Sequence, residues 1–243
     1  YLFNTLLWIM PILVLALLKL LPWAPWRKVI SYLLDGCASQ WVLFNSVNQR
    51  LLSGTRIRVD QFPELSPSQW YLVIANHQSW VDILVLQRLL HGKIPFLKFF
   101  LKKELIYVPF LGIAWWALDF PFMKRYSSEF LKKNPHLKGK DIETTRKACD
   151  KFKHKPVSVM NFLEGTRYTE QKHNKQQSPF NYLLKPKAGG IAFVLEAMGG
   201  HLTKIVNVTI HYPGGIPDFY RFISGKVDKI NVTIETIDID ESI

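Results

Sequence analysis

Residues 70–82 have the sequence WYLVIANHQSWVD and connect a predicted strand to a predicted helix. The first six residues form a short, mostly apolar run, which is typical of a buried strand. A helical run from Val81 to Leu90 follows the short polar link. Because α/β proteins place their functional side chains at strand ends, this stretch predicts an α/β domain with a site near His77 and Asp82.

Further strand patterns continue along the chain from Gly54. Arg56–Val59 alternates between polar and apolar residues, and five more runs are candidate strands: Phe96–Leu101, Phe120–Met123, Val157–Leu163, Lys204–His211 and Lys229–Ile239. Helical segments interleave with these runs, so residues 55–243 are predicted to form an α/β domain with a mixed central sheet flanked by helices. The polar loop Tyr168–Ser178 is the only low-complexity candidate.

Two apolar segments precede this domain and are predicted to form an N-terminal membrane-associated helical hairpin over residues 1–54. Leu2–Leu21 is nearly all apolar and is as long as a bilayer core is thick, about 30 Å. Near its end, Lys19 is expected to reach the membrane interface. Residues 26–52 have the apolar spacing of an amphipathic helix. The hairpin either spans the bilayer or dips into one leaflet.

The flanks of the hairpin bear on its orientation. Arg27 and Lys28 follow the interfacial residues Trp23 and Trp26, so the positive-inside rule places the remaining chain on the cytoplasmic side. A cleavage site for a signal peptide is not evident, and we expect the segment to be retained as an anchor. Because the first residue is Tyr1 rather than Met, we also expect residues to precede it.

The composition indicates an anionic partner. The net charge is +12, and residues 124–187 contain 16 basic and 6 acidic residues. Such a region attracts an anionic bilayer, a phosphorylated substrate or nucleic acid, or it is simply a solvated lysine-rich surface. Few aromatic residues are interleaved with these charges, which argues against nucleic acid. The two cysteines, Cys37 and Cys149, indicate neither a disulfide framework nor a metal site.

His77 and Asp82 form the sharpest chemical motif. A histidine is a suitable general base near neutral pH, and a carboxylate five residues later could hold its Nδ1–H and leave Nε2 free to accept a proton. The alternative is that Ser79 and Asp82 form a capping box at the helix start, a role compatible with the first. Ser79 is disfavoured as an acyl nucleophile because no second histidine is spaced to serve it.

A second motif, Glu164-Gly165-Thr166-Arg167, follows another predicted strand. Gly165 would allow a tight turn, and Thr166 and Arg167 offer donors suited to a phosphate. Taken alone, the motif is more simply explained as a strand-exit turn with a surface arginine, but it does not stand alone. Arg125, which follows the aromatic stretch from Trp115 to Met123, is a second candidate phosphate ligand.

Together and in this order, these blocks resemble the 1-acylglycerol-3-phosphate acyltransferase family. The family pattern is a histidine and an aspartate separated by four residues, then an arginine block, then Glu-Gly-Thr-Arg. The stretch Lys102-Lys103-Glu104-Leu105 is also similar to a Lys-Glu-Leu stretch of the family. The likeness runs roughly from Trp70 to Pro213, and the stretch WWALDFPFM at residues 115–123 is similar to bacterial inner-membrane members.

The resemblance implies acyl transfer from acyl-CoA or acyl carrier protein to the free hydroxyl of a lysophospholipid, most simply lysophosphatidic acid giving phosphatidic acid. His77 would be the base and Asp82 would orient it. Arg125, Arg167 and Lys102 would hold the acceptor phosphate, and Glu164 would position the site, for example by pairing with an arginine.

The same resemblance places the protein at a bacterial inner membrane, facing the cytoplasm, among membrane lipids. Neither a cofactor nor a metal nor nucleic acid is expected to take part. Two alternatives stay open from the sequence. One is an acyltransferase for another lysolipid, such as lysophosphatidylglycerol, and the other is a basic, membrane-tethered binding protein without catalysis.

Overall fold

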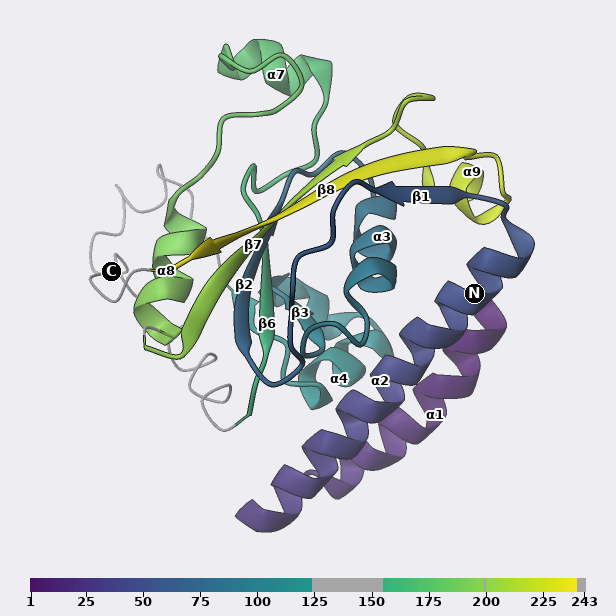
Figure 1. The fold of residues 1–243 in the computed structure, drawn as a ribbon. Helices are drawn as coiled ribbons and strands as arrows, with labels where there is room; N and C mark the ends of the chain where they lie inside the picture. Colours follow the sequence, from purple (N-terminus) through teal and green to yellow (C-terminus); the bar gives the residue numbers. More distant parts are fainter. Residues whose placement is uncertain (124–154, 199, 240–243) are drawn as a thin grey trace.

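The computed structural model describes residues 1–123, 155–198 and 200–239. A six-stranded mixed sheet lies at its centre, with strand order β1-β8-β7-β2-β6-β3 (Figure 1). Only β7 and β8 pair antiparallel, and the other neighbouring strands are parallel. The strands are β1 (Arg56–Val59), β2 (Trp70–Ala75), β3 (Leu97–Phe99), β6 (Ser158–Phe162), β7 (Leu202–His211) and β8 (Lys229–Asp238).

The predicted mixed sheet is therefore confirmed, with one strand divided. The predicted strand at Phe96–Leu101 ends at Phe99, and a separate short strand β4 (Leu101–Lys102) pairs instead with β5 (Phe122–Met123). This break turns the chain out of the main sheet just beyond the carboxyl end of β3.

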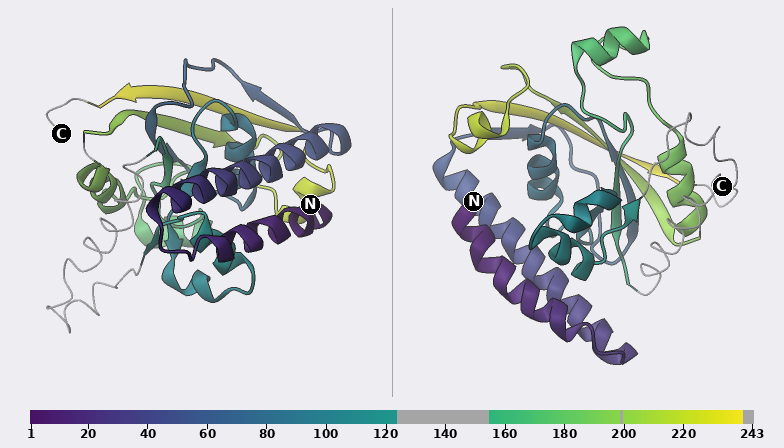
Figure 2. Two further views of the ribbon diagram at one scale, coloured as in Figure 1. Left: turned by 90° about the horizontal axis from the view of Figure 1, so that it is seen from below. Right: turned by 180° about the vertical axis from the view of Figure 1, so that it is seen from behind.

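Helices cover both faces of the sheet. Figure 2 shows α1 and α2 side by side, with α3 between them and the sheet, α4 beside α1, and α8 on the opposite face. The helices are α1 (Leu2–Leu18), α2 (Ala24–Leu52), α3 (Val81–Leu90), α4 (Leu111–Ala117), α7 (Glu170–Gln176), α8 (Gly189–Met198) and α9 (Phe219–Ile223), with a 3-10 helix η1 at Lys103–Tyr107. The helix α7 lies within the predicted polar loop, so that prediction is wrong there, and Thr169 caps it by accepting a hydrogen bond from the Lys172 amide.

The central strand β2 explains why its sequence is a continuous apolar run. Leu72 and Ile74 pack into the cluster beneath α8, whereas Tyr71, Val73 and Ala75 pack into the larger cluster on the α3 side. A strand covered on both faces has no solvated side on which polar residues could alternate. This burial fixes the position at which β2 ends and the site begins.

The two predicted N-terminal helices are present and share the larger apolar cluster with the sheet. Ile30 and Leu34 of α2 are almost completely buried in it, as are Ile12 and Ala16 of α1. Within the described residues, no helix is both long enough and apolar enough to cross a bilayer.

Lys19 does not lie where the sequence predicts. Its side chain is only 10% exposed, and its Nζ lies 2.6 Å from both the Ala117 carbonyl oxygen and the Asp119 carboxylate. A second buried cluster lies close by, where Lys98 and Lys155 contact the Asp35 carboxylate of α2. These five charged residues, here called the junction cluster, attach the hairpin to the sheet.

Candidate active site

The carboxyl ends of three parallel strands bring the site together. β2 is flanked by β6 on one side and β7 on the other, with Ala75 opposite both Phe162 and Val208. The residues that follow these three strands therefore meet at one edge of the sheet. His77, Glu164 and Tyr212 each lie within a few residues of a strand end.

His77 and Asp82 are in direct contact, as the sequence predicts. The His77 Nδ1 lies 2.9 Å from the Asp82 Oδ2. That oxygen also accepts hydrogen bonds from the Gln78 and Ser79 amides, at 2.6 and 2.8 Å, while Oδ1 accepts the Tyr212 hydroxyl at 2.6 Å. Because Asp82 is an acceptor throughout, Nδ1 carries the hydrogen, and Nε2 is left to accept a proton.

Asp82 makes the hydrogen bonds that both of its predicted roles require. Its acceptance of the Ser79 amide is one half of a capping box at the start of α3. The other half is replaced, because the Ser79 hydroxyl donates to the Pro217 carbonyl at 2.5 Å and accepts from the Val81 amide. The rigid start of α3 therefore also holds the imidazole.

Glu164 lies directly behind His77 and is almost completely buried. Its two carboxylate oxygens accept the backbone amides of His77 and Leu184, at 2.9 and 2.8 Å. Burial raises the pKa of Glu164, and the two amide hydrogen bonds act in the opposite direction. Among the described residues Glu164 has no arginine partner, so the expected pairing is not found there, and backbone amides do the positioning.

Aromatic stacking fixes the plane of the His77 ring. The rings of His77 and Phe162 are stacked, with centroids 3.8 Å apart and an interplanar angle of 11°. The His77 carbonyl also accepts the Tyr168 amide at 2.7 Å. Phe162 therefore covers one face of the imidazole, Asp82 holds its Nδ1 edge, and the Tyr168 amide holds the His77 backbone.

The Glu-Gly-Thr-Arg segment forms the predicted tight turn. Gly165 has a φ of +65°, which side-chain-bearing residues rarely adopt, and its amide donates back to the Phe162 carbonyl. The Lys172 ammonium, from α7, donates to both the Thr166 hydroxyl and the Arg167 carbonyl at 2.9 Å. Lys172 thus fixes the turn that the sequence assigns to phosphate binding.

Arg167 lies beside the start of α3. Its guanidinium carbon is 4.8 Å from the ring centroid of Trp80, an exposed residue three positions after His77. No described residue accepts a hydrogen bond from this guanidinium, so its N–H groups are available to an anionic ligand.

Of the other two predicted phosphate ligands, only Lys102 lies within the described residues. Lys102 is exposed on β4, and no contact links it to His77, Glu164 or Arg167 among the described residues. Arg125 lies outside the described residues.

Sequence reasoning missed two residues that hold the site. Tyr212 follows β7 and donates to Asp82, and a polar residue directly after a strand is the signal that could have identified it. The second is Asn76, to which the sequence analysis assigned no role, and its amide side chain exchanges two hydrogen bonds with the Ile210 backbone, at 2.8 and 2.9 Å. No group of His, Cys, Asp and Glu within the described ranges could hold a metal ion.

A family model described as Acyltransferase matches residues 56–212. The chain is 26% identical over 183 residues to 1-acyl-sn-glycerol-3-phosphate acyltransferase gamma of Mus musculus, covering 70% of this chain and 46% of that protein. It is 30% identical to the alpha form of Homo sapiens, covering 73% of this chain and 54% of that protein. The chain thus spans about half the length of these curated relatives.

Among solved structures, the chain is similar to the 1-acyl-sn-glycerophosphate acyltransferase of Thermotoga maritima. The TM-score is 0.48 at 19% identity, and the match covers 97% of this chain and 86% of that one.

Proposed function

Because this chain belongs to the acyltransferase family, we propose that it transfers a fatty acyl group from a thioester donor to the free hydroxyl of a lysophospholipid. The donor is acyl-CoA or acyl carrier protein, and the acceptor is most simply lysophosphatidic acid, which gives phosphatidic acid. The observation that carries this proposal is the His77–Asp82 pair at the sheet edge, whose Nε2 has no partner among the described residues.

The reaction needs one base and no covalent acyl-enzyme. The acceptor hydroxyl attacks the thioester carbonyl while His77 Nε2 removes its proton, and Asp82 stabilises the imidazolium that forms. When the tetrahedral intermediate collapses, the carbon–sulfur bond breaks and His77 returns the proton to the leaving thiolate. Such general acid–base assistance contributes about 10²–10⁴-fold in rate.

Arg167 supports a phosphate-bearing acceptor. Its guanidinium stacks on Trp80, which stands three residues after His77 in the chain. A guanidinium binds a phosphate through two parallel hydrogen bonds. Arg125 and Lys102 are further candidates for the same phosphate.

Exposed apolar side chains on α1 support membrane association of the hairpin. Leu2, Leu6, Met10, Val14 and Leu17 recur at helical spacing, and each is more than half exposed. Such a stripe suits insertion into one leaflet, with the catalytic edge at the interface and the chain on the cytoplasmic side of a bacterial inner membrane.

The decisive experiment offers purified protein a panel of lysolipids in mixed micelles, with either acyl-CoA or acyl carrier protein as donor. We expect a His77-dependent product and the highest kcat/KM with lysophosphatidic acid. A preference for lysophosphatidylglycerol would replace the acceptor and keep the chemistry. Lipid binding without transfer to any acceptor would leave only a membrane-tethered binding protein.

A further inference from the structure

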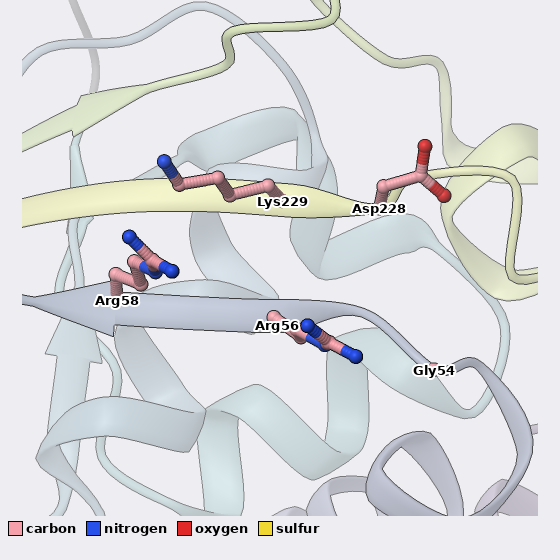
Figure 3. Close-up of a pocket in the computed structure, with 5 residues that line it drawn as sticks. All are labelled: Gly54, Arg56, Arg58, Asp228 and Lys229. Carbon is pink, nitrogen blue, oxygen red and sulfur yellow. The ribbon is translucent and has the colours of Figure 1, made fainter.

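A basic cleft lies on the sheet at its β1 edge, away from His77. It has a volume of about 360 Å³ and is lined by Gly54, Arg56, Arg58, Asp228 and Lys229 (Figure 3). β1 alternates, so Ile57 and Val59 pack against the apolar cluster while Arg56 and Arg58 are exposed on the other face. Lys229 lies opposite Arg56 in the parallel pairing of β1 with β8.

The cleft carries a net charge of +2 that described residues do not neutralise. Figure 3 shows the Lys229 side chain extending along β8 towards the part of the strand pair that carries Arg58, Arg56 reaching towards Gly54, and the Asp228 carboxylate turned away. Among the described residues, none of the three cations forms an ion pair. Three such cations on adjacent strands would attract a phosphate.

Exposed apolar residues of α2 and α9, here called the apolar border, precede in the chain the two segments that line this cleft. Leu51 and Leu52, at the end of α2, are 76% and 82% exposed, and Tyr220 of α9 is 68% exposed. The ends of α2 and α9 lie close together. A Cβ at Gly225, just after α9, would lie 3.0 Å from the carbonyl oxygen of Ser53, just after α2. The Arg56 amide also donates to the Asp228 carbonyl at 2.9 Å.

We propose that this cleft and its apolar border form a second membrane contact, in which Arg56, Arg58 and Lys229 bind the phosphate headgroups of anionic bilayer lipids. Basic side chains beside exposed aliphatic and aromatic ones fit an interface where charged headgroups meet acyl chains. Charges on an edge strand also discourage pairing with another chain, but that role needs neither a third cation from β8 nor an apolar border.

The contact is separate from the proposed acceptor site at Arg167 and does not depend on acyl transfer. The test therefore measures binding without turnover, so an inactive protein leaves this proposal intact, and failed binding leaves the proposed reaction intact.

The experiment measures cosedimentation of the full chain with vesicles of phosphatidylcholine, alone or mixed with phosphatidylglycerol. The variant is R56Q/R58Q/K229Q, and the matched control is K175Q/K185Q/K187Q, which removes the same charge from exposed residues around α7. Thermal melting confirms that both variants are folded.

We expect the cleft variant to lose about fivefold in affinity for the anionic vesicles for each charge removed, and little for phosphatidylcholine alone. The loss should shrink at high salt, because salt screens exposed charges. The control variant should lose much less. Equal losses in both variants would overturn the proposal, since net charge alone would then explain binding. Binding of acyl carrier protein, which is acidic, is measured on the same variants. A cleft variant that keeps its vesicle affinity but loses binding to acyl carrier protein would also overturn the proposal.

Discussion

The sheet edge that holds His77, Asp82 and Glu164, here called the catalytic edge, has buried carboxylates, and the junction cluster has half-buried ones. The two satisfy these carboxylates with different donors. At the catalytic edge, Asp82 and Glu164 accept backbone amides, a tyrosine hydroxyl and one imidazole. In the junction cluster, Asp35 and Asp119 contact the ammonium groups of Lys19, Lys98 and Lys155.

Under the proposed function, this difference separates a site that moves a proton from one that fixes two elements together. Neutral donors leave His77 able to gain and lose a proton while the carboxylates stay in place. Paired ammonium and carboxylate groups instead keep fixed charges, and removing either partner leaves the other buried and uncompensated. We therefore expect catalytic-edge variants to change rates and junction variants to change stability.

His77→Ala should have the largest effect of the variants considered. General base catalysis contributes about 10²–10⁴-fold in rate, so removing the base should lower kcat by that factor or more. The melting temperature should stay near that of the wild type. Steady-state kinetics with thermal melting checks both. A folded His77→Ala protein that turns over normally would remove the basis of the comparison.

Asp35→Asn should give the largest loss of stability. It leaves Lys98, which is fully buried, without its main counter-charge, and breaking a buried pair costs about 3–5 kcal/mol. Chemical denaturation measures this loss, and the kcat of the folded fraction should change little. A large fall in kcat at unchanged stability would show that the junction cluster takes part in the chemistry.

The same variant has a pH signature. Burial lowers the pKa of Lys98, and Asp35 is the first group that raises it again, so Asp35→Asn should lower that pKa further. The unfolded state then binds more protons than the folded state between the lowered pKa and the ordinary lysine pKa. Across this window the stability of Asp35→Asn should rise with pH more steeply than that of the wild type.

Arg167→Ala should have an intermediate effect that is confined to the acceptor. Loss of charge-assisted hydrogen bonds worth about 1.5–3 kcal/mol should raise the acceptor KM tenfold or more and leave the donor KM unchanged. Arg167→Lys should rescue it only in part, because an ammonium lacks the planar fork. If the variant raised the KM for lysophosphatidic acid and for lysophosphatidylglycerol equally, Arg167 would have a structural role instead.

Tyr212→Phe should have the smallest effect and gives the finest test of the catalytic edge. It removes one neutral donor from Asp82, worth about 0.5–1.5 kcal/mol, and keeps the ring. We expect a few-fold fall in kcat and a shift of the acidic limb of the kcat–pH profile, with acceptor KM unchanged. A loss of stability without any shift of the pH profile would show that Tyr212 only supports packing.

The sequence by itself determined the elements whose signals are local. The apolar run Trp70–Ala75 and the helix Val81–Leu90 have the predicted bounds, because burial on both faces and helical spacing are properties of short segments. His77 meets Asp82 because five residues across a strand-to-helix turn leave few other arrangements.

Only the tertiary structure decided which distant groups complete these local ones. Tyr212 reaches Asp82 across 130 residues, Glu164 joins His77 to Leu184, and Lys19 pairs with Asp119 rather than with the membrane interface. The basic cleft likewise exists only because β8 pairs with β1. Periodicity specifies which face of a segment is buried but not which strand lies beside it, so contacts between strand ends follow from sheet order alone.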